Sequence, residues 1–238
     1  MFLDEVFMLK IIGAFFVLLV GLLVIRKEPS YWLNRLVAAS FLLFSLSNIF
    51  EALASDFWFI IVAPMEVIYS WVVIIWCTSV ITGIFSTLLF LLSAILIRYG
   101  SFEALRPRVL LSTLTSGIAL SIVVFFNQII YAVPDPIKGT VVYWNLAGLV
   151  ALFVVPALIT LASVIIMLTV YPDLENPKAK RSVLLLAVGV LFLILGILPY
   201  ALSGLFPLFQ LLPNIGMTLF WTIGSLLCFL AFQHKIRG

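Results

Sequence analysis

The sequence is poor in the residues that most often carry chemistry. It contains one histidine, His234, and two cysteines, and Asp, Glu, Lys and Arg together make up only 10% of it. A single histidine excludes bis-histidine haem and the usual histidine clusters for zinc or copper within this chain. His234 also follows the last apolar run, too far out to complete a Ser/His/Asp or Cys/His set inside the membrane.

The two cysteines, Cys77 and Cys228, stand in separate apolar runs and form no CxxC pair, which is typical of small hydrophobic residues in helices. No Gly-rich phosphate loop is present. No soluble basic segment alternates with aromatic residues, so no nucleic-acid partner is expected. We therefore predict a protein that is not an enzyme and holds no metal and no cofactor.

Retinal binding is also excluded, because it needs a Schiff-base lysine in the middle of a helix. The last apolar run contains none, and Lys10 lies near the start of the first one. No paired charges are expected in mid-membrane.

What the sequence has in excess is apolar residues. They make up 65% of the 238 residues, and the mean hydropathy is +1.31. Soluble domains contain about 45–50% apolar residues. A core of this size cannot hide the surplus, so lipid must cover it. We predict an all-α polytopic integral membrane bundle that forms a single transmembrane domain over residues 1–238.

Long apolar runs place the predicted spans, since about 20 residues cross a bilayer core. The runs are 7–25, 35–54, 58–98, 109–132, 143–170, 182–205 and 213–233. The run 58–98 is long enough to hold one span or two. We therefore predict seven transmembrane helices, with eight as the alternative.

Charge favours seven spans. With one span in 58–98, eleven of the thirteen Lys and Arg residues fall on one side of the membrane, and only Lys10 and Lys138 fall on the other. Short basic loops face the cytoplasm. The N-terminus is therefore predicted outside and the C-terminus inside. The first run agrees, because Asp4 and Glu5 precede it and Arg26 and Lys27 follow it.

A third span of this length is awkward. Pro64 is expected to start or kink a helix, and "VITGIFST" at 80–87 to bend it. Residues 57–64 would then lie along the outer interface. Pro156 and Pro199 are expected to kink the fifth and sixth spans.

Polar residues at membrane depth are candidates for function. In the seven-span topology several of them gather near the outer side and predict a polar, partly acidic cup for a small cation, a polar molecule or a lipid headgroup. The alternative is that they are helix ends in the headgroup zone, where caps meet water. The residues are Glu66, Glu51, Asn48, Asn127, Gln128 and Asn145.

Several segments resemble the seven-helix N-terminal sensor region of prokaryotic histidine kinases. They are "NRLVAASFLLFSLSNIFEALA" at 34–54, "NQIIYAVPDP", "VVYW", "NPKAKR" and the last run with its outer Pro-x-x-Gln-x-x-Pro loop. The Trp usual in the family's second helix is replaced by Phe44 and Ser45. Family members continue into coiled-coil, kinase or cyclase domains. The resemblance implies an outward-facing sensor or ligand-binding module in a prokaryotic plasma membrane, with its output supplied by another protein or lost.

Three functions remain open. A sensor or ligand-binding module would pass its signal to a membrane or cytoplasmic protein partner. A small transporter would gate a path past Glu66 with bends at Gly83, Pro156 and Pro199. An accessory subunit would pack against a larger complex. The basic inner residues would dock a partner or contact anionic membrane lipids; they are Arg98, Arg106, Arg108, Lys178, Lys180 and Arg181.

Overall fold

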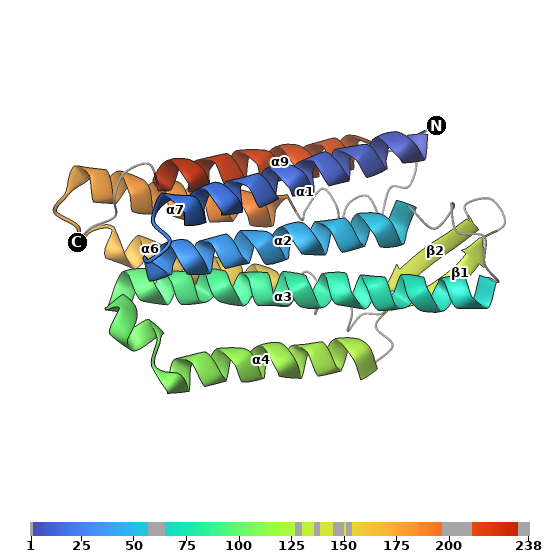
Figure 1. Cartoon of the computed structure of the whole chain (residues 1–238), viewed down its shortest axis with the longest axis horizontal. Helices are drawn as coiled ribbons and strands as arrows, with labels where there is room; N and C mark the ends of the chain where they lie inside the picture. The colour runs from blue at the N-terminus through green and yellow to red at the C-terminus, as the bar shows by residue number, and fades with distance from the viewer. Residues whose placement is uncertain are drawn as a thin grey trace.

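The computed structural model shows a bundle of long helices with a small β-hairpin at one end (Figure 1). It describes the backbone of residues 2–56, 65–126, 130–135, 139–144, 150, 154–196 and 211–232, and the side chains of residues 7–54, 70–126, 150, 154–196 and 215–232. The helices are α1 (Phe2–Lys27), α2 (Trp32–Asp56), α3 (Met65–Ala104), α4 (Pro107–Phe126), α6 (Val155–Val170), α7 (Pro177–Leu195) and α9 (Leu211–Ala231). The strands are β1 (Ile130–Asp135) and β2 (Gly139–Trp144).

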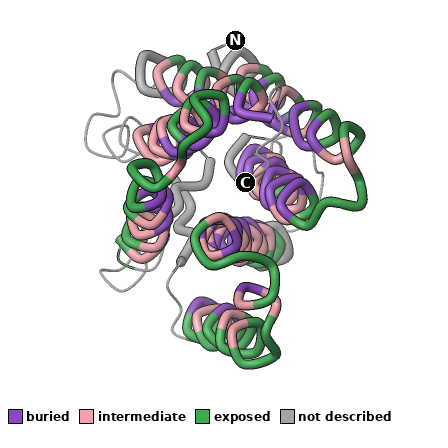
Figure 2. Tube along the Cα trace, turned by 90° about the vertical axis from the view of Figure 1, so that its left-hand side faces the viewer, coloured by how far each residue is buried: buried purple, intermediate pink, exposed green. Residues whose placement is uncertain are grey.

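Six of the described helices close a ring. In the order of their contacts they are α1, α2, α3, α6, α7 and α9, and α9 packs back against α1. Helix α4 stands outside this ring against α3, and most of it is exposed (Figure 2). Large side chains such as Phe41, Leu186 and Met217 fill the bundle and are fully buried. The buried sides of the ring helices therefore face one another.

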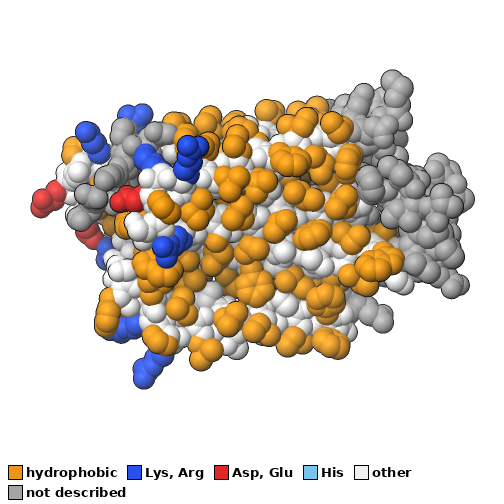
Figure 3. Space-filling model, viewed as in Figure 1, with side chains coloured by type: hydrophobic (Ala, Val, Ile, Leu, Met, Phe, Trp, Pro, Cys, Tyr) orange, Lys and Arg blue, Asp and Glu red, His pale blue; other side chains and the backbone are white. Residues whose placement is uncertain are grey.

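The outer surface suits a membrane. Among the described residues, four helical segments are long and apolar enough to cross one: Phe7–Lys27, Trp32–Ala54, Ser70–Ala104 and Pro107–Phe126. Two shorter apolar helices, Val155–Val170 and Ile215–Ala231, accompany them. Hydrophobic side chains cover the long body of the molecule, and the charged side chains visible in this view gather at one end (Figure 3). This arrangement supports the predicted helical membrane bundle.

The long third run forms one helix. Helix α3 continues from Met65 to Gly100, where the backbone leaves the helical region (φ 81°, ψ 173°), and a short turn then leads into α4. Residues 80–87, where the sequence predicts a bend, stay helical, and the backbone of α3 departs from helical φ/ψ at Gly100. Glycine adopts a positive φ without the steric cost that a Cβ brings. The predicted interfacial segment 57–64 lies outside the described residues.

The hairpin adds a short β element to the predicted helical bundle and corrects two of the span limits. Strands β1 and β2 pair antiparallel, with Ile130 opposite Trp144 and Asp135 opposite Gly139. The predicted spans 109–132 and 143–170 ran into these strands. Hydropathy does not distinguish a short apolar strand from a helix. The signal was the β-branched and aromatic residues on both sides of a Pro- and Gly-containing turn.

Pro156 lies in the first turn of α6, and the described residues Val150 and Val154 before it are π-helical. The predicted kink at Pro156 stays a prediction. Pro199 lies outside the described residues.

Helices α7 and α9 approach each other through glycine. A Cβ added to Gly189 would lie 2.6 Å from Cys228 Sγ and 2.7 Å from the Gly224 carbonyl oxygen. Small residues permit such close contact between membrane helices. The α7–α9 side of the ring therefore depends on Gly189 and Gly224 having no side chain.

We expect Gly189→Ala to lower the free energy of unfolding in detergent by about 1–3 kcal/mol, because the new methyl group has no room. Unfolding in mixed micelles followed by circular dichroism measures this change. Gly13→Ala is the matched control, since its Cβ would meet Thr218 Cγ2 at an ordinary 3.4 Å. Equal stability of the two variants would contradict the close packing.

Candidate functional site

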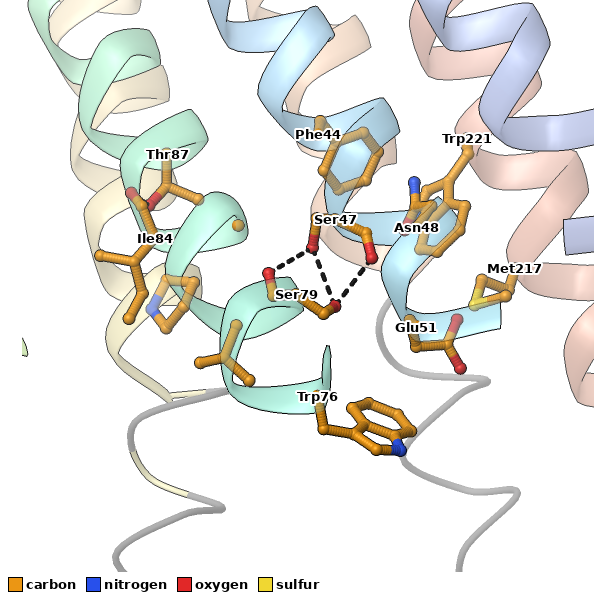
Figure 4. A pocket seen from close by; sticks show the side chains of 13 residues that line it. Phe44, Ser47, Asn48, Glu51, Trp76, Ser79, Ile84, Thr87, Met217 and Trp221 are labelled. Atoms are coloured by element: carbon orange, nitrogen blue, oxygen red, sulfur yellow. Dashed lines mark hydrogen bonds between the residues drawn. The ribbon is translucent and has the colours of Figure 1, made fainter. Parts of the chain in front are cut away.

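A cavity lies inside the helix ring, towards the end that carries the hairpin. Its volume is about 110 Å³, and its walls are mostly apolar (Figure 4). Its lining comes from α2, α3, α6 and α9. The lining residues are Phe44, Ser47, Asn48, Glu51, Trp76, Ser79, Val80, Gly83, Ile84, Thr87, Pro156, Met217 and Trp221.

Two of the residues predicted for the polar cup meet here. Asn48 and Glu51 lie one turn apart on α2, and both are buried and line the cavity. The other predicted cup residues are not placed. Asn127, Gln128 and Asn145 lie outside the described residues, as does the side chain of Glu66.

Lys10 joins this site from α1. Its Nζ lies 2.8 Å from Glu51 Oε1, and the two side chains are 5% and 8% exposed. Both lie about one turn from the ends of their apolar segments, away from mid-membrane. Sequence reasoning placed Lys10 at a helix start and missed its partner. The order of the spans gave part of the signal for this pair, since antiparallel neighbours bring the start of the first span next to the end of the second.

Two pairs of serines exchange hydrogen bonds between α2 and α3 beside the cavity. Ser47 Oγ donates to the Ser79 carbonyl oxygen at 2.8 Å, and Ser79 Oγ donates to the Ser47 carbonyl oxygen at 2.7 Å. Ser40 and Ser86 repeat this exchange two turns away, at 2.5 and 2.9 Å. Both pairs have the same antiparallel register, so they fix how α2 and α3 align. Ser47 and Ser79 appear joined by dashed lines in Figure 4.

Two N–H donors in the cavity wall have no hydrogen-bond partner among the described residues. They are Asn48 Nδ2 and Trp221 Nε1, and their residues are 4% and 6% exposed. The Phe44 ring packs edge-on against the Trp221 indole, with centroids 5.1 Å apart. A Cβ on Gly196 would lie 2.5 Å from Trp221 Nε1, so this glycine gives the indole its position. Leaving a buried donor unsatisfied costs about 1–3 kcal/mol.

The predicted docking residues lie at the opposite end of the bundle, where α3 and α6 end and α4 and α7 begin (Figure 1). Arg98 pairs with Asp173 at 2.6 Å, and Arg106 pairs with Glu103 at 2.7 Å. Lys180 lies over the Tyr171 ring.

The remaining docking residues, Arg108, Lys178 and Arg181, are exposed. Tyr99 and Phe102 at this end are also exposed, at 61% and 76%. Basic and aromatic side chains mixed in this way are typical of a membrane–water interface.

Neither a metal-binding group nor a similarity to a known protein identifies the function of this site. The described residues contain no group of three or more His, Cys, Asp or Glu side chains that would hold a metal ion. No protein-family model matches the sequence, and no curated protein matches it. What the site does must therefore be argued from its own geometry.

We expect Glu51→Gln to destabilise the bundle by about 3–5 kcal/mol, because it removes the carboxylate charge that pairs with the buried Lys10 ammonium. Unfolding in mixed micelles measures the loss. Glu103→Gln is the matched control, because it breaks the exposed pair with Arg106 and should cost under about 1 kcal/mol. A Glu51→Gln loss as small as the control's would show that the buried pair contributes little.

Proposed function

We propose that this protein is a non-enzymatic membrane sensor that binds a small molecule in the cavity of the helix ring. The observation that carries the proposal is a mostly apolar cavity between the helices of the ring that is lined by Glu51, the acidic member of the buried Lys10–Glu51 ion pair. Ligand sites in proteins are mostly apolar, with a few placed polar groups, and often lie between the helices of bundles.

Its output would lie at the basic end. A seven-span topology, with the N-terminus outside and this end in the cytoplasm, follows from the charge rule. In the described part of the chain, the Lys and Arg residues other than Lys10 all lie at or next to the helix ends that meet there. A separate membrane or cytoplasmic protein would read the state of the bundle at this surface, as the resemblance to kinase sensor regions implies.

Filling the cavity tests the proposal. We expect wild-type protein, taken gently from its own membranes, to retain a small molecule in native mass spectrometry, and Val80→Phe to lose it. Val80 lines the cavity, and phenylalanine would occupy its space. Val123→Phe is the matched control, because Val123 faces outward on α4 and is 39% exposed. Equal loading of both variants would place the ligand elsewhere. A stable protein that arrives without a small molecule would count against binding.

Cysteine labelling tests the topology. We expect Thr140→Cys in β2 to react with a membrane-impermeant maleimide in intact cells, and Ser101→Cys at the basic end to react only after the cells are opened. Cys77 and Cys228 are buried and provide a low background. The opposite labelling pattern would reverse the orientation, and labelling of both positions from outside would overturn the seven-span topology.

Transport is the second candidate function. It is favoured by the buried Lys10–Glu51 pair beside the cavity, since ionisable groups within membrane bundles often mark solute or ion paths. Solute flux into proteoliposomes that Val80→Phe blocks and Val123→Phe leaves intact would favour transport over sensing.

A further inference from the structure

We infer that the cavity binds the unbranched alkyl chain of an amphiphile, with the chain parallel to the helices and the polar group towards the hairpin end. This inference rests on the proposed function, since it assigns the chemical class of the ligand to the same cavity. The shape of the cavity, the surface that it offers and its depth in the membrane each support this class.

The cavity is elongated along the helix axes. Its lining on α3 recurs from Trp76 to Thr87 at the three- and four-residue intervals of one helix face. Residues 44–51 of α2 line it with the same spacing. The stripe on α3 extends for about 16 Å, at 1.5 Å per residue. A space of this shape suits a chain that lies along the helices better than a compact molecule.

The polar side chains of the lining already have partners within the protein. Ser47 and Ser79 donate to each other's carbonyl oxygens. Thr87 Oγ1 donates to a carbonyl oxygen of its own helix at 2.8 Å. Glu51 Oε1 accepts a hydrogen bond from Lys10 Nζ at 2.8 Å. These groups therefore give a polar ligand little to bind.

The surface that a ligand meets is mainly carbon. The side-chain N–H groups of Asn48 and Trp221 are fully buried, so a ligand in the cavity does not reach them. A strongly polar or charged ligand would lose its hydration in the cavity without gaining a partner, whereas hydrocarbon loses nothing. The apolar part of the lining consists of Phe44, Val80, Ile84, Pro156, Met217 and the rings of Trp76 and Trp221.

The depth of the cavity matches one leaflet of a bilayer. The hydrocarbon core is about 30 Å thick, so each leaflet contributes about 15 Å. Glu51 lies one turn from the end of the apolar segment Trp32–Ala54, which places the hairpin end of the cavity near a membrane–water interface. The polar group of an amphiphile would lie at that end, and its chain would extend towards Phe44 and Thr87. The chain of a membrane lipid and that of a free amphiphile share this chemistry.

Two tryptophans report how deep a bound chain reaches (Figure 4). Trp76 lies at the hairpin end of the lining, and Trp221 lies deeper, beside Phe44. They are 4% and 6% exposed, so bromine dissolved in the surrounding lipid does not contact them. Because bromine quenches an indole only at close approach, quenching of either ring indicates a chain inside the cavity.

The probes are two undecanols, one brominated on its last carbon and the other on the carbon next to the alcohol group. Each is added to wild-type protein in nanodiscs, and the emission of each indole is the part that is missing in Trp221→Phe or in Trp76→Phe. We expect the end-brominated probe to remove most of the Trp221 emission and to spare Trp76, and the other probe to do the reverse. The opposite pattern, equal quenching by the two probes, or no quenching would overturn the inference.

Filling the cavity separates binding inside it from binding elsewhere. We expect Val80→Phe to abolish the quenching of both rings and Val123→Phe, the matched control on the outer face of α4, to preserve it. Quenching that survives in Val80→Phe would place the probes outside the cavity and would also overturn the inference. The two probes are compared in wild-type protein, so the test does not depend on the stability of the filled variant.

The two proposals fail differently. If native mass spectrometry shows a molecule that Val80→Phe loses, but neither probe quenches, the cavity binds a ligand of another class and only this inference falls. If no molecule is retained and neither probe quenches, both proposals fall. Where both tests succeed, the retained mass identifies the source of the chain, since a membrane lipid and a single-chain free amphiphile differ in mass.

Discussion

The polar and small side chains of this bundle determine which helices pack together, because lipid gives apolar helices little reason to prefer one neighbour over another. The contact between α2 and α3 carries the Ser40–Ser86 and Ser47–Ser79 pairs. The contact between α1 and α2 carries the Lys10–Glu51 ion pair. The contact between α7 and α9 depends on Gly189 and Gly224. These three contacts make up half of the ring.

The small and polar side chains at the helix contacts also leave a cavity in the ring. Ser79, Gly83 and Thr87 follow one another at intervals of four residues and therefore share one face of α3. Their side chains are small, so α3 supplies little volume to the centre. Trp221 approaches from α9 but packs over Gly196 and against Phe44, which holds its ring at the wall. The residues that let the helices align closely are thus too small to fill the space that they enclose.

Much of this architecture could be predicted from the sequence. The parts that could not be predicted were missed for physical reasons. Apolar run length located each of the helices that the structure describes, and the charge pattern predicted that Arg98, Arg106 and Lys178 share one end, as they do. Hydropathy alone missed the hairpin, because Val141 and Val142 are as apolar in a strand as in a helix.

Of the candidate site, the sequence singled out Asn48 and Glu51 by their polarity. It did not find Trp76, Met217 or Trp221, since an aromatic or methionine residue in an apolar run gives no sign of facing a cavity. The sequence placed Lys10 near the start of the first span but did not predict its ion pair with Glu51. The order of the spans alone does not give the rotation of each helix about its axis.

The cavity and the basic end lie at different ends of the bundle, so a ligand bound in the cavity would be sensed through the helices that connect them. Helices α2, α3 and α9 contribute to the cavity and also run towards the far end. The two serine pairs lock α2 to α3, so these two helices would respond as one unit. Helix α9 is held differently. It contacts the cavity through Met217 and Trp221, and at its other end the Phe232 carbonyl oxygen accepts a hydrogen bond from Lys27 Nζ. Met217 and Trp221 therefore join one end of α9 to the cavity, and the Lys27–Phe232 bond joins its other end to the basic surface where α1 ends.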